Sequence, residues 1–169
     1  MTEAAGGDMD SFEELVHRYQ HGAFNVAYGM VGDEHQAADL AQEAFLRVLE
    51  NANTYKPLAK FSTYFFSILR RLCIDHYRKK KPDTRADFVS ESEHIKTPPD
   101  KLIQSEYNEK VHSAIAALPH RQQNALILKH FQQMSYREIA EIIGCSVSAV
   151  DSLLMRARQT LRDKLTDLE

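Results

Sequence analysis

The stretch YREIAEIIGCSVSAVDSLLMRARQTLR, residues 136–162, constrains the fold more than any other part of the chain. Ile139 and Ile143 fall on one face of a short helix at the helical period. Gly144 can supply the positive φ that a tight inter-helix turn needs, and Ser146 is suited to cap the next helix. The pattern predicts a helix-turn-helix, whose second helix is built to enter the major groove of DNA. A helical hairpin inside an ordinary bundle is the alternative that these residues leave open.

The composition favours an all-α fold. Of the 169 residues, 43% are hydrophobic, and the chain has no Trp and few Gly or Pro residues. No apolar run is long enough to span a membrane, and the N-terminal MTEAAGGDMD lacks the features of a signal peptide. Cys73 and Cys145 have no CxxC spacing, so we expect reduced thiols and a cytoplasmic location.

Apolar periodicity predicts three helices in the first half of the chain, over residues 10–32, 33–50 and 61–81. Asp33 opens the second of these helices, and Ser62 is the expected cap of the third. The expected apolar face of the second helix comprises Ala37, Leu40, Ala41, Ala44, Phe45, Val48 and Leu49. The expected inward face of the third comprises Phe61, Phe65, Ile68, Leu69 and Leu72.

A break in the pattern divides the chain. Residues 82–99, PDTRADFVSESEHIKTPP, are polar, lack periodicity and end in a Pro-Pro pair, which is typical of a flexible linker. The helical pattern then resumes and continues through the helix-turn-helix. We therefore expect two small helical domains, residues 1–81 and 100–169, joined by this linker.

Charge is distributed unevenly along the chain, although the net charge is only −3. Residues 1–50 are acidic, with Arg18 and Arg47 almost the only positive side chains. Residues 70–81, RRLCIDHYRKKK, are strongly basic and contain a single acid, Asp75. Blocks of opposite sign predict two kinds of partner, one a basic protein surface and the other a polyanion.

Residue patterns that would indicate catalysis or metal binding are weak. His17 and His21 lie four residues apart, a spacing that can share a metal, but no obvious third ligand is near. Cys73 lies among apolar residues and is expected to be a core thiol. The chain has no Gly-rich phosphate loop, nucleophile elbow or HExxH motif. We expect no enzymatic activity, no metal and no other cofactor.

Four segments in the same order along the chain carry a resemblance to a known family. They are FEELVHRYQ (12–20), DLAQEAFLRVLE (39–50), FSTYFFSILRRLCIDHYRKKK (61–81), and ALPHRQQNALIL (117–128) continuing through the helix-turn-helix. Together they resemble the extracytoplasmic-function (ECF) sigma factors, minimal bacterial sigma factors with only the second and fourth sigma domains. The resemblance implies a specificity subunit that directs RNA polymerase to promoters in a stress or signal response and is held inactive by an anti-sigma factor.

The resemblance assigns the 39–50 helix to the polymerase core. In the family this helix grips the clamp coiled coil of the largest polymerase subunit. The implied contact residues are Asp39, Gln42, Glu43, Leu46 and Arg47. From the residues alone, an acidic helical face meeting a basic partner and an ordinary solvated face are both open.

The resemblance assigns the 61–81 helix to the melted −10 promoter element. An opened strand needs cations along its phosphates and aromatic faces for its bases. The implied residues are Tyr64, Arg70, Arg71, Arg78, Lys79 and Lys80, with Tyr64 the aromatic side chain expected to be exposed. Loop residues 53–60 would lie where the family captures a flipped base. Tyr64 and Arg71 stand where the family usually has Trp and Asn, which affects the expected base preference.

The helix-turn-helix would read the −35 element through Arg137, Ser148, Ala149, Asp151, Ser152 and Arg156. Residues 149–154 read Ala-Val-Asp-Ser-Leu-Leu where the family commonly has Thr-Val-Lys-Ser-Arg-Leu, so two cations are missing. Asp151 either accepts a hydrogen bond from cytosine N4 or points away from the groove.

Two further classes of function compete with the sigma factor. A conventional helix-turn-helix regulator would bind duplex operators unaided as a dimer. A sigma-like decoy would only sequester an anti-sigma factor, and the basic run at 70–81 argues against it.

Overall fold

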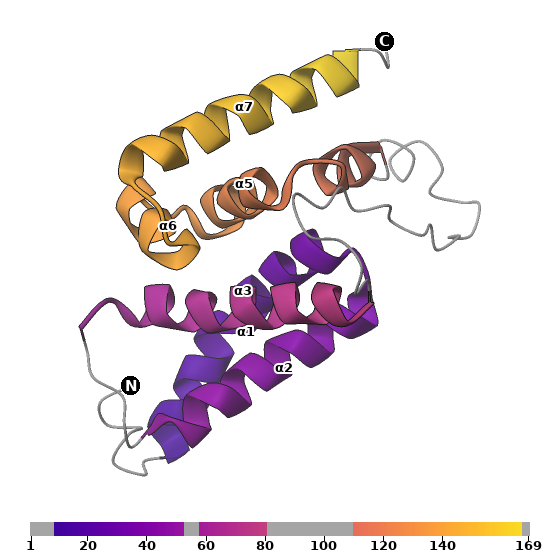
Figure 1. Ribbon diagram of the computed structural model, residues 1–169. Coiled ribbons are helices and arrows are strands. Elements are labelled where there is room, and N and C mark those ends of the chain that lie inside the picture. Colours follow the sequence, from indigo (N-terminus) through magenta and orange to yellow (C-terminus); the bar gives the residue numbers. More distant parts are fainter. Residues whose placement is uncertain (1–8, 53–57, 81–109, 167–169) are drawn as a thin grey trace.

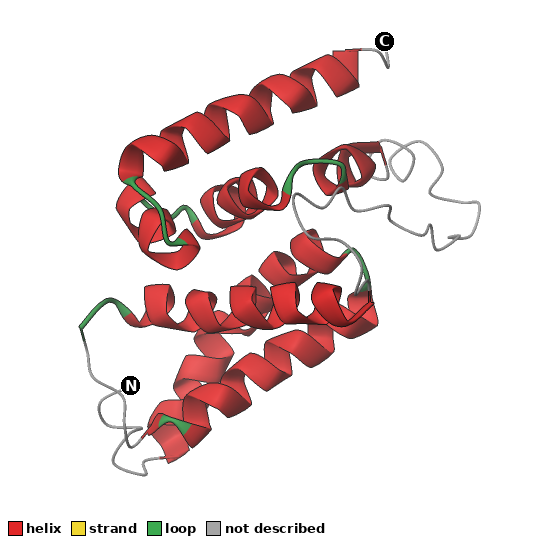
Figure 2. Cartoon of the chain, in the orientation of Figure 1, coloured by secondary structure: helices red, strands yellow, loops and turns green. Residues whose placement is uncertain are grey.

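The computed structural model describes residues 9–52, 58–80 and 110–166, and within these ranges the chain forms helices joined by short turns (Figures 1 and 2). The elements are α1 (Met9–Val31), α2 (Glu34–Glu50), α3 (Phe61–Lys80), α5 (His120–Gln132), α6 (Tyr136–Ile143) and α7 (Val147–Thr166). Residues 110–116 are also helical. The expected all-α class is therefore confirmed, whereas the expected linker over residues 82–99 lies outside the described residues.

Local signals set the helix ends much as the sequence predicts. Gly32 ends the first helix with a φ of 71°, and the Asp33 carboxylate then caps α2 by accepting a hydrogen bond from the Gln36 N–H at 2.8 Å. The expected cap at Ser62 is wrong, because α3 already begins at Phe61. The carbonyl that accepts from the Tyr64 N–H belongs to Lys60, at 3.2 Å, so Ser62 lies inside the first turn.

Helices α1, α2 and α3 pack around an aromatic core. The Phe45 and Phe65 rings lie 4.6 Å apart between α2 and α3. The buried stripe of α3 is rotated from the expected one, and it consists of Phe65, Phe66, Leu69 and Cys73. Phe61, Ile68 and Leu72 lie at its margins and are only partly buried. Leu49 of α2 is exposed, so its expected place in the core is wrong.

The C-terminal helices form a second layer that packs directly on the first. Helix α5 lies against α1, and α6 lies against α3, while α7 packs on α5 and α6 at the far side of this layer (Figure 1). Buried side chains run without interruption from α1–α3 into α5–α7. The two halves therefore share one core, an arrangement that the sequence left open.

Two glycines on one face of α1 allow α5 to approach closely. A Cβ on Gly29 would lie 3.1 Å from Ile127 Cδ1, and a Cβ on Gly22 would lie 2.6 Å from Gln132 Nε2. Ile127 is itself almost fully buried by this contact. The absence of a side chain at Gly29 therefore allows the close approach of α5, whereas a side chain at Gly22 would meet only the movable end of Gln132.

Replacing Gly29 with Leu should separate the two layers while leaving each layer helical. The added side chain would occupy the volume of Ile127, and overpacking of this kind costs about 1–3 kcal/mol. Small-angle scattering should report a larger radius of gyration for Gly29→Leu, with unchanged helical circular dichroism. Gln20→Leu, at an exposed position of α1, is the control. An unchanged radius for Gly29→Leu would contradict the role given to this glycine.

Candidate polymerase and nucleic-acid interfaces

The outward face of α2 holds all five residues predicted to contact polymerase. Asp39, Gln42, Leu46 and Arg47 are exposed, and Glu43 is partly exposed. Burial of Ala37, Ala41, Ala44, Phe45 and Val48 against α1 and α3 fixes this orientation. Glu43 accepts a hydrogen bond from Arg47 Nε at 2.8 Å, an ion pair of four-residue spacing. Leu46 stands beside this pair with 54% of its surface exposed, so the face is mixed apolar and charged.

The basic end of α3 divides into exposed and covered side chains. Arg71, Arg78 and Lys79 are exposed along one side of the helix, together with Asp75. Lys80 is the last helical residue, and its side chain lies outside the described part of the chain. The expectation that Tyr64 is exposed is wrong, because its ring lies partly buried, 6.4 Å from that of Phe61. Tyr64, the aromatic residue expected to stack on bases, is therefore packed against hydrophobic residues at the start of α3.

Arg70, also predicted to follow the −10 strand, lies between the two layers. Its Nη1 donates to the Ile142 carbonyl of α6 at 3.4 Å. With the Asn124 amide turned so that its nitrogen donates to the His120 carbonyl, the amide oxygen accepts from Arg70 Nε at 3.1 Å. Burial and the nearby Arg121 guanidinium lower the pKa of Arg70. In this arrangement the Arg70 guanidinium is partly desolvated and directed at protein acceptors.

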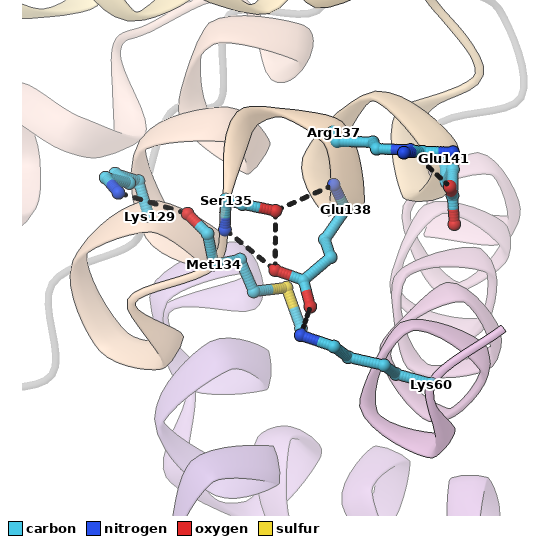
Figure 3. Close-up of polar contacts among 7 residues, drawn as sticks. All are labelled: Lys60, Lys129, Met134, Ser135, Arg137, Glu138 and Glu141. Carbon is cyan, nitrogen blue, oxygen red and sulfur yellow. Dashed lines mark hydrogen bonds and ion pairs between the residues drawn. The ribbon is translucent and has the colours of Figure 1, made fainter.

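An ion pair links the start of α3 to the helix-turn-helix (Figure 3). Lys60 Nζ lies 2.9 Å from Glu138 Oε1. The other carboxylate oxygen of Glu138 accepts from the Ser135 N–H at 2.8 Å and from its hydroxyl at 2.7 Å. The Ser135 hydroxyl in turn accepts from the Glu138 N–H, which completes a capping box. These hydrogen bonds and the Lys60 ammonium hold the pKa of Glu138 at about 2.

The predicted helix-turn-helix is present with the expected turn chemistry. Helix α6 ends at Gly144, which has a φ of 73° and whose N–H donates to the Ala140 carbonyl at 2.9 Å. Ser146 caps α7, because its hydroxyl accepts from the Ala149 N–H at 3.2 Å. Val150 and Leu154 then anchor α7 in the core with no exposed surface. Local sequence alone thus specifies how α7 is presented.

The residues predicted to read the −35 element lie on the outside of this motif. Exposed members of the set are Arg137, Ser148, Asp151, Ser152 and Arg156, whereas Ala149 is only partly exposed. Arg137 pairs weakly with Glu141, at 3.8 Å. Asp151 lies on the flank of α7, and the structure leaves both of its proposed roles open. The five exposed members are all polar or charged, as residues that meet a DNA groove should be.

Other candidate groups lie away from these faces. Cys73 is buried, and burial raises the pKa of its thiol to about 12, consistent with the expected core thiol. His17 and His21 are both exposed on α1. Among the described residues, no three His, Cys, Asp or Glu side chains are grouped so that they could hold a metal. None of the described helices is long and apolar enough to cross a membrane.

The polar residues that join the two layers are not among those predicted from the sequence. Gln123 and Asn124 are buried, and Gln123 Nε2 donates to the Gly29 carbonyl at 3.2 Å. Nothing in the local pattern of α5 marks them, because their partners are distant in the sequence. The Ser135–Glu138 capping box, in contrast, follows a readable S-x-x-E signature.

Comparison with known families identifies the class of protein. Residues 15–82 match the family Sigma-70 region 2, and residues 108–161 match Sigma-70, region 4. The fold and these two matches define a sigma factor of RNA polymerase. The chain is 34% identical to ECF RNA polymerase sigma factor SigW of Bacillus subtilis (strain 168), over 96% of this chain and 92% of the relative. It is 30% identical to the RNA polymerase sigma-H factor of Pseudomonas aeruginosa, over 96% and 90%.

The chain therefore belongs to the ECF sigma factors, a family of transcription initiation factors. Two solved structures share its fold. CnrH in complex with the cytosolic domain of CnrY has a TM-score of 0.77 at 23% identity, covering 98% of this chain and 94% of that one. The sigma factor RpoE in complex with the anti-sigma factor NepR from Bartonella quintana has a TM-score of 0.71 at 20% identity, covering 92% and 97%.

Removing the Glu138 charge should destabilise the protein in a pH-dependent way. The pKa of Glu138 is lowered from 4.5 to about 2 on folding, so its stabilisation is fully present above about pH 4.5. It is lost as the pH falls towards 2. Glu138→Gln should therefore lower the free energy of unfolding by about 1–2 kcal/mol at pH 7, and the difference should shrink below pH 4.

Urea unfolding at a series of pH values measures this difference. Glu141→Gln is the matched control, since Glu141 lies one turn later on α6 and its ion pair with Arg137 is long, at 3.8 Å. A difference between wild type and Glu138→Gln that stays constant from pH 7 to pH 3 would contradict the assignment.

Proposed function

We propose that this protein directs core RNA polymerase to promoters through three faces on separate helices. They are the mixed face of α2, the basic side of α3 and the outward face of α7. The observation that carries the proposal is that both sigma regions match the chain and that the α2 and α7 faces are exposed in one structure. The chain would supply binding only, and the polymerase would perform the chemistry, in the cytoplasm.

The test is transcription in vitro with purified core polymerase and a promoter library. Specific transcripts that require the added chain are the expected result. A decoy would give none, and a conventional regulator would bind duplex operators without polymerase.

The α2 face suits the clamp coiled coil of the largest polymerase subunit. Its exposed Leu46 offers apolar area beside the Glu43–Arg47 pair. Interfaces of this kind concentrate binding energy in a few apolar or arginine side chains surrounded by a polar rim. The remaining acidic residue of this face, Asp39, would contribute to on-rate and register.

The basic side of α3 suits the phosphates of an opened −10 strand. Arg71, Arg78 and Lys79 can meet phosphates directly because they are already exposed. Arg70 would join them by giving up its hydrogen bond to the Ile142 carbonyl of α6, and Lys60 by leaving Glu138. We infer that −10 binding and separation of the two layers are coupled.

A partner that holds the protein inactive is part of the proposal. The two solved structures described above are both complexes, and in one of them the sigma factor RpoE is bound to the anti-sigma factor NepR. An anti-sigma factor that bound α2 or α7 of this chain would cover the same faces that polymerase and DNA need.

Replacing Leu46 with Glu should weaken core binding at least tenfold, a loss typical of an interfacial hot spot. Fluorescence titration of labelled protein with core polymerase measures it. Leu58→Glu is the control, since Leu58 is still more exposed but lies outside α2. Equal affinities for wild type and Leu46→Glu would exclude this face.

Replacing Arg71 and Arg78 with Gln should reduce the salt dependence of holoenzyme binding to a pre-melted promoter. Each lost phosphate contact on a single strand lowers the slope of log K against log salt by about 0.7, so the double variant should lose about 1.4. Arg18→Gln is the control, because Arg18 is exposed but paired with Glu14 on α1. Equal slopes of log K against log salt for the double variant and wild type would show that the basic side of α3 is an ordinary solvated face.

A further inference from the structure

The buried residues of α7 show which side of this helix faces away from the core. Val150, Leu154 and Ala157 are fully buried against α5 and α6. With 3.6 residues per turn, the ridge diametrically opposite comprises Ser148, Ser152, Met155 and Gln159. All four are exposed, and α7 lies at the outer side of its layer (Figure 1). This ridge is the part of the helix-turn-helix that would lie deepest in a groove.

Met155 is the exception on this polar ridge. It has 63% of its surface exposed, which makes it the most exposed large apolar side chain among the described residues of α5–α7. The two serines nearest to it are short, and Ser152 already donates its hydroxyl proton to the Ser148 carbonyl at 3.1 Å. Met155 therefore reaches farther from the helix axis than either serine and carries no polar group except a weakly accepting sulfur.

The only apolar group on the floor of the major groove is the C5-methyl of thymine. A methionine side chain is flexible and polarizable, so it can adapt to such a small target. Asp151 on the same helix repels phosphate, and sequence discrimination by α7 must come from contacts with base edges.

We propose that Met155 is a specificity-determining residue, which selects a thymine in the −35 element by contact with the C5-methyl. The inference rests on the proposed function, since it requires α7 to lie in the groove. It adds a base-selecting side chain beyond Ser148, Asp151, Ser152 and Arg156, and it names the base that is selected.

The experiment removes the methyl from the DNA and the side chain from the protein independently. Holoenzyme is assembled from the full chain and core polymerase, and its preferred −35 element is selected from a randomised library. Each thymine of that element, on either strand, is then replaced by deoxyuridine, and affinity is measured at fixed salt. Wild type should lose affinity about fourfold at one position, the effect of uncovering one methyl-sized group.

Met155→Ala should bind the thymine DNA about as weakly as wild type binds the deoxyuridine DNA, and should lose no more when the methyl is removed. Met155→Leu should retain most of the methyl sensitivity. Met9→Ala is the matched control, because Met9 is a methionine of similar exposure on α1. It should behave as wild type on both DNAs.

Three results would overturn the inference while leaving the proposed function intact. In the first, the selected −35 element contains no thymine on either strand. In the second, the affinity of the wild-type holoenzyme is unchanged by every deoxyuridine substitution. In the third, the Met155→Ala holoenzyme still loses affinity when the methyl group is removed. A holoenzyme that selects no −35 sequence at all would overturn the proposed function as well.

Discussion

The close contact between α1 and α5 is the constraint on which the rest of the arrangement depends. Gly29 lets Ile127 pack against the backbone of α1, and Gln123 donates to the Gly29 carbonyl in the same place. With α5 fixed there, α6 is brought against α3, and the Lys60–Glu138 and Arg70–Ile142 contacts become possible. Helix α7 is left on the far side of its layer, where its polar ridge is exposed. This close packing contact thus places Arg70 of the basic helix between the layers and leaves the outward ridge of α7 exposed.

The elements governed by local chemistry could be predicted from the sequence. The turn at Gly144, the caps at Asp33 and Ser146 and the outward face of α2 each depend on residues within one or two helical turns. The buried stripe of α3 was misplaced because that helix is apolar over much of its circumference, and Phe66 and Cys73 compete with Ile68 and Leu72 for the core. Periodicity alone cannot choose between adjacent stripes when both are hydrophobic.

The contacts between the layers could not be predicted, because they join residues far apart in sequence that carry no local signal. In the sequence Arg70 is one cation of a basic run, and nothing there indicates that it lies beside the Ile142 carbonyl and the Asn124 amide. Several groups at this interface are polar, and polar interfaces lose less on separation than hydrophobic ones because water can replace the lost partners. The apolar contact of buried Ile127, in contrast, stabilises the packed arrangement of the two layers.

Arg70 connects this packing to the proposed binding of the −10 strand. The Arg70 guanidinium donates from Nη1 to the Ile142 carbonyl and, with the Asn124 amide turned, from Nε to its oxygen, so a phosphate that takes these N–H groups must displace both acceptors and favours the separated form. The free energy that holds α6 on α3 is then subtracted from the affinity for the opened −10 element. By the same linkage, polymerase or DNA that binds the separated form must weaken the α3–α6 contact by an equal amount. Helix α7 carries no such cost, because its ridge is exposed in the packed form. The proposed −10 and −35 faces therefore differ in the free energy needed to expose them, although they belong to one chain with one continuous core.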